Sequence, residues 1–302
     1  MTEGNACQDE GLVVFLECAC ELGEGPLWCP ERQRLFWVDI EGQRIWCADP
    51  AGQAWAKPVV GPLGFLARGA DDLLVTGVNR GFAWLDPETA ALRSLGDPLL
   101  SAPGTMMNDG KADRGGRLVA GSKITGGDQP LGAAWSLSAG RCTPALNGFT
   151  VFNGPAFSPD GRRIYFADSP SGRIETATYD SESGAIGRRE LFASLPDGFP
   201  DGMTVDRDGG LWNAVWDGWR IDRYLPDGTL DRSLPVPVPR PTSIAFGGGD
   251  YAEVFVTSAR TGLSAGALAD APLSGAVFTG VPGEFGLPEA RVRLPAESWG
   301  SA

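Results

Sequence analysis

The chain has 302 residues, of which 42% are hydrophobic and 21% are charged, and its formal net charge is −13. This composition is ordinary for a globular protein, and an acidic chain without Lys/Arg clusters argues against nucleic acid or an anionic membrane surface as partners. No apolar run reaches the roughly 18 residues needed to cross a bilayer, which excludes a helical membrane span.

The histidine and cysteine content narrows the chemistry and the compartment. The chain has no histidine, so a Ser-His-Asp triad, a histidine general base and His-ligated zinc are excluded. The first 11 residues are acidic and polar and do not resemble a signal peptide. Five of the six cysteines fall in the first 47 residues and none forms a CxxC pair: Cys7, Cys18, Cys20, Cys29, Cys47 and Cys142. We therefore expect reduced thiols and a cytoplasmic location.

Taken in chain order, short apolar runs alternate with turn sequences. Residues 11–20 are predicted to form the first strand, and two further strands follow at residues 35–40 and 44–47. Similar runs then recur, separated by turn sequences such as PDG and DRGG, which favour tight hairpins. The second residues of the central runs are Phe36, Leu74, Leu118, Tyr165, Trp212 and Phe255, separated by 38, 44, 47, 47 and 43 positions.

Six repeats of this length, each with about four short strands, predict a six-bladed β-propeller of four-stranded antiparallel blades. The strand at 11–20 has no place in the first repeat, so we expect it to complete the last blade. Residues 1–302 are predicted to form one all-β domain, with residues 1–10 flexible and short helices only within 180–190 or 262–272. A β-solenoid or two β-sandwiches are the alternatives.

Four polar residues precede the central runs in matched register. Glu24, Asn108, Asn153 and Asp201 lie 10 to 12 positions ahead of them, which places each at the same end of a first strand. Because the first strands of a propeller line its axis, these side chains are predicted to converge there. Two carboxylates and two carboxamides without a basic residue favour a bound cation, and oxygen ligands suit calcium, magnesium or manganese without excluding zinc. Alternatively, each is simply a turn former.

Over nearly its whole length the sequence resembles the gluconolactonase, regucalcin and senescence-marker-protein group of six-bladed propeller lactonases. The resemblance rests on LGEGPLW, MNDGKADRGGRL, FNGPAFSPDGRRIYFADS, PDGMTVDRDGGLW and the tail FVTSARTGLSAGALADAPLSGAVF. It implies a single divalent metal held by Glu24, Asn153 and Asp201. It also implies that Asp201 is the general base and that Asn108 lies beside the metal and contacts substrate.

Two positions depart from the pattern of this group or match it loosely. Met106 stands where many sugar lactonases of the group have an arginine, which makes the pocket more apolar there. An acidic residue that contacts sugar hydroxyls aligns loosely with Asp128. Trp216 and Trp219 either wall the pocket or pack within their blade.

The resemblance therefore implies a divalent-metal-dependent hydrolase that opens a lactone ring, most simply a sugar (aldono)lactone. The metal would be calcium, zinc, magnesium, manganese or iron(II), and the partner a small-molecule lactone bound by a monomer or weak homodimer. Two alternatives stay open: a phosphotriesterase-like or broader esterase acting on an apolar substrate, and a non-enzymatic calcium-binding regulatory propeller.

Overall fold

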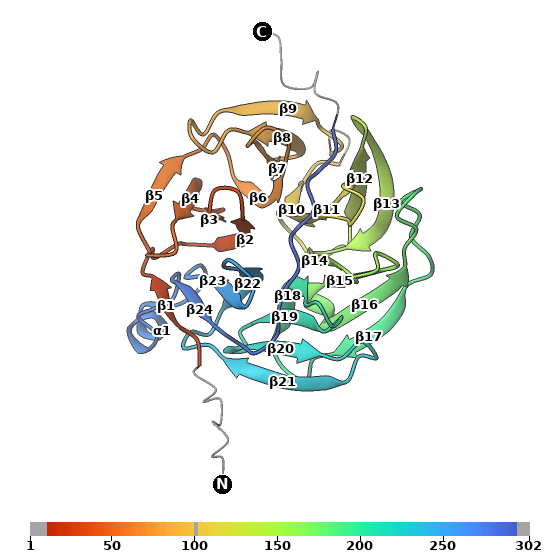
Figure 1. The fold of residues 1–302 in the computed structure, drawn as a ribbon. Helices are drawn as coiled ribbons and strands as arrows, with labels where there is room; N and C mark the ends of the chain where they lie inside the picture. Colours follow the sequence, from red (N-terminus) through yellow and green to blue (C-terminus); the bar gives the residue numbers. More distant parts are fainter. Residues whose placement is uncertain (1–10, 100–101, 295–302) are drawn as a thin grey trace.

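The computed structural model describes residues 11–99 and 102–294. Within them, 24 strands form six four-stranded antiparallel sheets arranged as blades around a central axis (Figure 1). The predicted six-bladed propeller is therefore confirmed. The expected flexibility of residues 1–10 concerns a segment outside the described residues.

Within each of the first five blades the strands follow chain order from the axis outward. The first blade contains β2 (Gly23–Cys29), β3 (Arg34–Asp39), β4 (Arg44–Ala48) and β5 (Ala54–Pro58). The second contains β6 (Leu63–Arg68), β7 (Leu74–Val78), β8 (Gly81–Leu85) and β9 (Leu92–Gly96). The third contains β10 (Thr105–Ala112), β11 (Leu118–Ile124), β12 (Gly132–Ser138) and β13 (Arg141–Phe149).

The later blades repeat this arrangement, and the last one uses both ends of the chain. The fourth contains β14 (Phe152–Phe157), β15 (Arg163–Asp168), β16 (Arg173–Thr178) and β17 (Glu190–Ser194). The fifth contains β18 (Phe199–Val205), β19 (Leu211–Trp216), β20 (Arg220–Tyr224) and β21 (Leu230–Pro235). The sixth contains β22 (Pro241–Gly247), β23 (Glu253–Ser258), β24 (Val277–Gly280) and β1 (Val13–Leu16).

The N-terminal strand closes the ring, as predicted, because β1 pairs antiparallel with β24. It is shorter than the predicted 11–20. The amide of Cys18 donates to the carbonyl of Leu16 at 3.1 Å, and Ala19 adopts a φ of 49°, so the chain turns away from the blade. The single α-helix of the described residues, α1 (Ala265–Asp270), lies within the predicted range 262–272. Ser264 caps its N-terminus, because the Ser264 side chain accepts a hydrogen bond from the backbone amide of Ala267. Residues 180–190 contain no helix.

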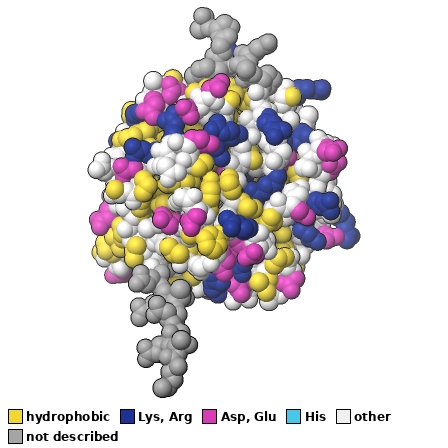
Figure 2. Space-filling view, in the orientation of Figure 1, with side chains coloured by type: hydrophobic (Ala, Val, Ile, Leu, Met, Phe, Trp, Pro, Cys, Tyr) yellow, Lys and Arg dark blue, Asp and Glu magenta, His cyan; other side chains and the backbone are white. Residues whose placement is uncertain are grey.

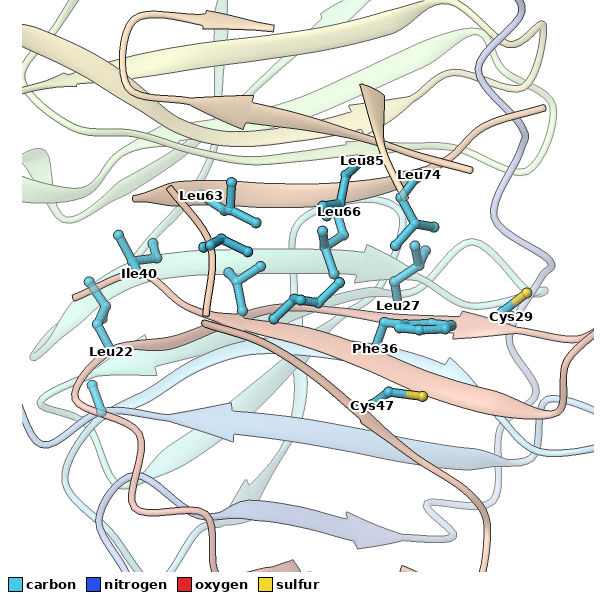
Figure 3. Packing of buried hydrophobic residues seen from close by; sticks show 14 residues of the cluster. Leu22, Leu27, Cys29, Phe36, Ile40, Cys47, Leu63, Leu66, Leu74 and Leu85 are labelled. Atoms are coloured by element: carbon cyan, nitrogen blue, oxygen red, sulfur yellow. The ribbon is translucent and has the colours of Figure 1, made fainter. Parts of the chain in front are cut away.

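Blades pack face to face through buried apolar side chains. Between the first two blades, Phe36 and Val38 of β3 contact a cluster that includes Leu63, Leu66 and Leu74 of the next blade (Figure 3). Each such side chain stabilises the fold by about 1.5–3 kcal/mol relative to leaving it exposed. The six residues that marked the repeats in the sequence are all buried in second strands. The repeat period therefore reflects the packing between blades.

Every innermost strand carries one extra residue relative to its partner strand. In the β2–β3 pair, Glu24 lies opposite Val38 and Leu27 lies opposite Phe36. An advance of three residues along β2 is therefore matched by only two residues along β3. The same irregularity falls between Leu63 and Leu66, Met107 and Gly110, Asn153 and Ala156, Pro200 and Met203, and Pro241 and Ser243. Such β-bulges bend a strand and redirect its side chains. The bulges therefore occur at one level around the axis, at or beside the polar residues Glu24, Asn108, Asn153 and Asp201.

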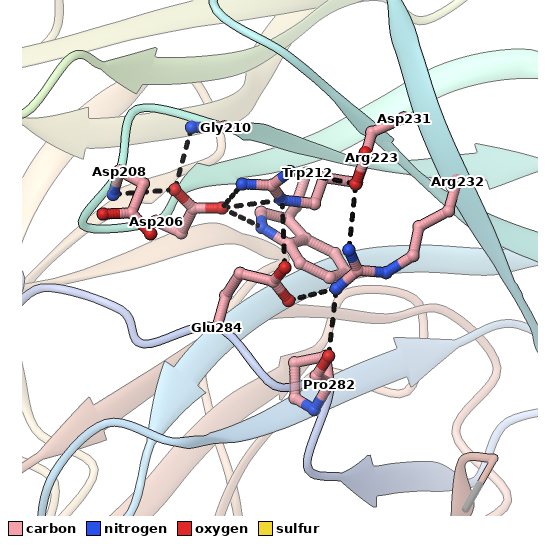
Figure 4. A network of polar contacts seen from close by, with 9 residues as sticks. All are labelled: Asp206, Asp208, Gly210, Trp212, Arg223, Asp231, Arg232, Pro282 and Glu284. Atoms are coloured by element: carbon pink, nitrogen blue, oxygen red, sulfur yellow. Dashed lines mark hydrogen bonds and ion pairs between the residues drawn. The ribbon is translucent and has the colours of Figure 1, made fainter. Parts of the chain in front are cut away.

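The C-terminal segment, residues 281–294, crosses the ring after β24 (Figure 1). It is fixed at both ends. Arg232 contacts Glu284 and donates to the Pro282 carbonyl at 2.9 Å, within a network that also ties Arg223 to Asp206 (Figure 4). At the far side, the amide of Val292 donates to the Arg68 carbonyl at 2.7 Å.

In its middle, the segment places Glu289 against the ends of the inner strands, where Lys111 lies 3.1 Å from the Glu289 carboxylate. On the face shown in Figure 2, acidic and basic side chains are interspersed. The segment thus covers the axis at the end where the inner strands finish.

Candidate active site

A cavity of about 310 Å³ lies at the opposite end of the axis, where the inner strands begin. Glu24 of β2, Asn108 of β10, Asn153 of β14 and Asp201 of β18 all line it. All four come from innermost strands of different blades and all are buried or nearly so. Each lies at or directly beside a bulge, which explains how residues so distant in sequence face one cavity.

A chain of hydrogen bonds fixes the two asparagines. The Asn108 amide nitrogen donates to the Phe152 carbonyl at 2.9 Å and to the Asn153 side-chain oxygen at 2.8 Å. The Asn153 amide nitrogen donates to Ser169 Oγ at 2.8 Å, and Ser169 in turn donates to the Pro200 carbonyl at 2.7 Å. Both N–H donors of Asn108 are therefore engaged within the protein, and its oxygen remains as an acceptor.

The carboxylates are strongly perturbed. Burial, with the negative charges of Asp201 and Asp109, raises the pKa of Glu24 well above its usual range. Burial and the charge of Asp109 likewise raise the pKa of Asp201, while Lys123 opposes both shifts. Asp109 lies deeper on the axis, and burial raises its pKa to about 7. Lys111 opposes the shift of Asp109. Two carboxylates thus line the cavity, with Lys123 as the one basic residue among the described residues that line it, which favours binding of a cation.

The donor set fits a hard divalent cation. Glu24 accepts one hydrogen bond, from the Gly25 amide at 3.0 Å, which leaves its second oxygen for another partner. The Asn153 oxygen has two lone pairs, of which Asn108 occupies one. Carboxylate and amide oxygens are the ligands that calcium and magnesium prefer. Within residues 11–99 and 102–294 no group of three or more His, Cys, Asp or Glu side chains forms a metal cluster, so amide oxygen is essential to this set.

Lys123 is the residue that sequence reasoning missed. It lines the cavity from β11, beside the four inner-strand residues, and it is the Cα partner of Met106 across the β10–β11 pair. The register argument considered only first strands, and Met106 was expected to make the pocket more apolar at that point. Extending the register argument to second strands would have located a cation directly across from that methionine.

The other predicted site residues lie differently. Met106 is half-buried and packs against the apolar cluster between the first two blades, and Asp128 is exposed. Neither lines the cavity in the part of the chain that the structure describes. Trp216 does line it, together with Phe199, whereas Trp219 is 46% exposed and does not. One cavity wall is therefore aromatic.

Fold and site together define a six-bladed propeller with an acidic, oxygen-rich cavity at one end of its axis. The sequence model described as the SMP-30/Gluconolactonase/LRE-like region matches residues 22–260, which include Glu24, Asn108, Asn153 and Asp201. The chain belongs to this family, as the sequence motifs indicated.

Individual relatives agree in length and architecture. L-arabinolactonase of Azospirillum brasilense is 38% identical over 278 residues, covering 89% of this chain and 91% of that protein. Pentonolactonase XacC of Haloferax volcanii is 35% identical over 260 residues, covering 81% of this chain and 84% of that protein. The crystal structure of regucalcin from Agrobacterium tumefaciens, described as a calcium-binding protein, superposes with a TM-score of 0.89 at 29% identity, covering 94% and 97% of the two chains.

Proposed function

We propose that this protein is a hydrolase that opens the ring of a lactone, most simply a sugar lactone, with the help of one divalent cation. The observation that carries the proposal is the convergence of Glu24, Asn153 and Asp201 on a single cavity. Relatives that match most of the chain are named as sugar lactonases, which supports the same reaction class.

The cation would be held by Glu24, Asn153 and Asp201. When bound, it would supply Lewis-acid polarisation of the lactone carbonyl. Burial and the repulsion between carboxylates raise the pKa of Glu24 and Asp201, and a bound cation would oppose both effects, so that both carboxylates would be ionised at neutral pH. Ser169 would orient the Asn153 amide, because it accepts from the nitrogen and so leaves the oxygen to accept from Asn108 and to serve as a ligand.

Asp201 is the proposed general base. In its ionised form it would take the proton from water as the water attacks the carbonyl carbon. The chain has no histidine, and Asp201 lies within the cavity, so it can reach a substrate there.

Asn108 and Lys123 would then divide the recognition of substrate. Because both N–H groups of Asn108 are engaged, its oxygen would accept a hydrogen bond from a substrate hydroxyl. Lys123 would stabilise the oxygen that becomes negative in the transition state. Met106 and Asp128, expected at the substrate, stay as proposals for substrate contacts.

The decisive experiment is a panel of substrates assayed after chelation and after adding back each candidate metal: calcium, zinc, magnesium, manganese and iron(II). We expect hydrolysis of aldonolactones that disappears with chelator and returns with at least one metal. Turnover of no lactone under any of these conditions would contradict the proposal.

A second candidate is hydrolysis of a less polar ester, including a phosphotriester. The aromatic wall formed by Phe199 and Trp216 favours a substrate with an apolar part. An aryl lactone and an organophosphate ester in the same panel distinguish this alternative. Metal-dependent thermal stability with no turnover would instead indicate a regulatory calcium-binding role.

The cytoplasmic location and the monomeric or weakly dimeric state also remain proposals. The cysteines within the described residues are free, which supports a reducing compartment.

A further inference from the structure

Two cysteines lie together where the ring is closed, outside the cavity. Cys18 and Cys20 follow β1, and their sulfur atoms are 3.5 Å apart. The turn at Ala19, with a φ of 49°, brings the two side chains to the same side of the chain. Cys20 is 1% exposed, whereas Cys18 is partly accessible. A partly exposed cysteine thus lies against a buried one.

The surroundings of this thiol pair favour a reactive Cys18. The Cys20 thiol donates to the Cys18 sulfur, which itself donates to the Gly275 carbonyl at 3.1 Å when protonated. Hydrogen bonding from Cys20 lowers the pKa of Cys18, although burial opposes it. The pKa of Cys20 is raised, first by its bond to Cys18 and then by burial. The outer sulfur therefore takes the negative charge and the inner one keeps its proton.

A buried tryptophan supplies an independent indication. Trp37 is fully buried, and its indole N–H has no hydrogen-bond partner at ordinary distance among the described residues. It packs in the same buried cluster as Cys20, with Cys18 against that cluster, and its N–H lowers the pKa of both thiols. A buried N–H without a partner is costly, and a thiolate is the acceptor that would satisfy it.

We propose that Cys18 and Cys20 form an oxidisable dithiol, which hydrogen peroxide converts to a reversible disulfide. In the first step the Cys18 thiolate attacks one peroxide oxygen. The O–O bond breaks, a sulfenic acid forms, and the departing hydroxide leaves as water after taking up a proton. In the second step the Cys20 sulfur attacks that of Cys18, the S–S bond forms, and the sulfenic oxygen leaves as water with the Cys20 proton. Two thiols and one peroxide thus give one disulfide and two waters.

The other described thiols lack this combination. Cys29 and Cys47 are buried, and burial raises the pKa of both. Cys142 is exposed, but burial of its sulfur raises its pKa to about 11. Cys142 therefore serves as an internal standard: an exposed cysteine residue whose pKa no neighbouring group lowers.

The test uses the full chain treated with graded hydrogen peroxide and then blocked with an alkylating reagent. Cleavage at glutamyl bonds releases residues 18–21, because Glu17 and Glu21 flank the pair, and this separates it from Cys7 and Cys29. Disulfide formation in this peptide is seen as a loss of two hydrogens and of alkylation. We expect it at least about tenfold faster than the oxidation of Cys142. The reason is that the pKa of Cys18 is lower than that of Cys142, and each unit of pKa changes the thiolate fraction tenfold. Dithiothreitol should restore both thiols.

Single substitutions separate the role of Cys18, which attacks the peroxide, from that of Cys20, which closes the disulfide. Cys20→Ser should stop at a sulfenic acid on Cys18 that a sulfenic-acid probe traps, whereas Cys18→Ser should react no faster than Cys142. Trp37→Phe should slow the oxidation of Cys18, while Cys142→Ser should leave it unchanged. Oxidation of Cys142 at the same rate or sooner, or absence of the disulfide in the 18–21 peptide, would overturn the proposal. Circular dichroism of each variant checks that the fold is retained.

Discussion

The amide nitrogen of Asn108 lies 2.8 Å from the side-chain oxygen of Asn153, so a residue of the third blade orients a proposed metal ligand of the fourth. The same nitrogen holds the Phe152 carbonyl. The Asn108→Asp substitution replaces the donating amide with a carboxylate. The carboxylate oxygen then faces the Phe152 carbonyl and the Asn153 oxygen, which are both acceptors, so both hydrogen bonds are lost. We expect a loss of about 1–3 kcal/mol in the free energy of unfolding, measured by urea denaturation. Unchanged stability would mean that the contact does not orient Asn153.

Asn153→Ala should weaken metal binding more than folding. The variant loses one oxygen ligand, while β14 keeps its backbone pairing with β15. We expect the dissociation constant for calcium or zinc to rise at least about tenfold, measured by isothermal titration calorimetry. Asn147→Ala, at an exposed position of β13, is the matched control. Equal affinities of the two variants would remove Asn153 from the ligand set.

Asp201→Asn should abolish hydrolysis and leave the fold intact. It removes the proposed base and one carboxylate charge, and the expected loss in kcat is about 10²- to 10⁴-fold. Because burial and Asp109 disfavour a negative charge at this position, the metal-free variant should unfold at a temperature no lower than the parent. The exposed Asp250→Asn controls for a general loss of charge. An active Asp201→Asn enzyme would contradict the assignment of the base.

Lys123→Met tests the cation that faces the cavity. If Lys123 stabilises the developing oxyanion, kcat should fall about 10²- to 10³-fold with little change in KM. Lys57→Met, on the outer strand β5, is the control, since it changes the net charge equally without touching the cavity. A rise in KM at constant kcat would instead indicate that Lys123 only binds the substrate.

The ion pair between Glu31 and Arg291 attaches the C-terminal segment to the first blade, and it should make the stability of the protein depend on pH. Burial raises the pKa of Glu31, but a backbone amide, Arg291 and Arg68 outweigh it and hold the value at about 2. The pKa of Glu31 is lower in the folded protein than its usual value of 4.5, so the ionised carboxylate stabilises the fold. This contribution of Glu31 to the free energy of unfolding is complete above pH 4.5 and is lost as the pH falls toward 2.

Glu31→Gln should therefore flatten the fall in unfolding temperature between about pH 5 and pH 2. The side chain is 45% exposed, so solvent screening limits the effect to below about 1 kcal/mol. Glu17→Gln, also at an exposed glutamate, is the control. Parallel pH profiles of Glu31→Gln and the parent would show that the ion pair does not stabilise this attachment.

Most of the architecture was accessible from the sequence because the repeat is local. Turn dipeptides and buried residues such as Phe36 and Trp212 recur with the period of a blade, and register alone grouped Glu24 with Asp201. The length of β1 was overestimated, since the turn at Ala19 depends on contacts with Gly275, far along the chain. Lys123 escaped because it lies on a second strand, where side chains mostly pack between blades.

The sequence pattern could not predict how the side chains of the site are oriented. Nothing in the sequence indicates that Asn108 uses both amide hydrogens internally, because its acceptors belong to the following blade. Likewise, no sequence pattern indicated that the loop of residues 125–131 leaves Asp128 exposed.

The pairing of β1 with β24 has a consequence for the order of events during synthesis. The first strand of the ring emerges from the ribosome long before its partner, so the sixth blade stays incomplete until residues 277–280 have been made. Until then β1 has no place to dock, and the outer edge of β23 is open to pairing with other chains. Final closure must therefore follow translation of residues 277–280, and a ribosome stalled before them would present an unfinished edge.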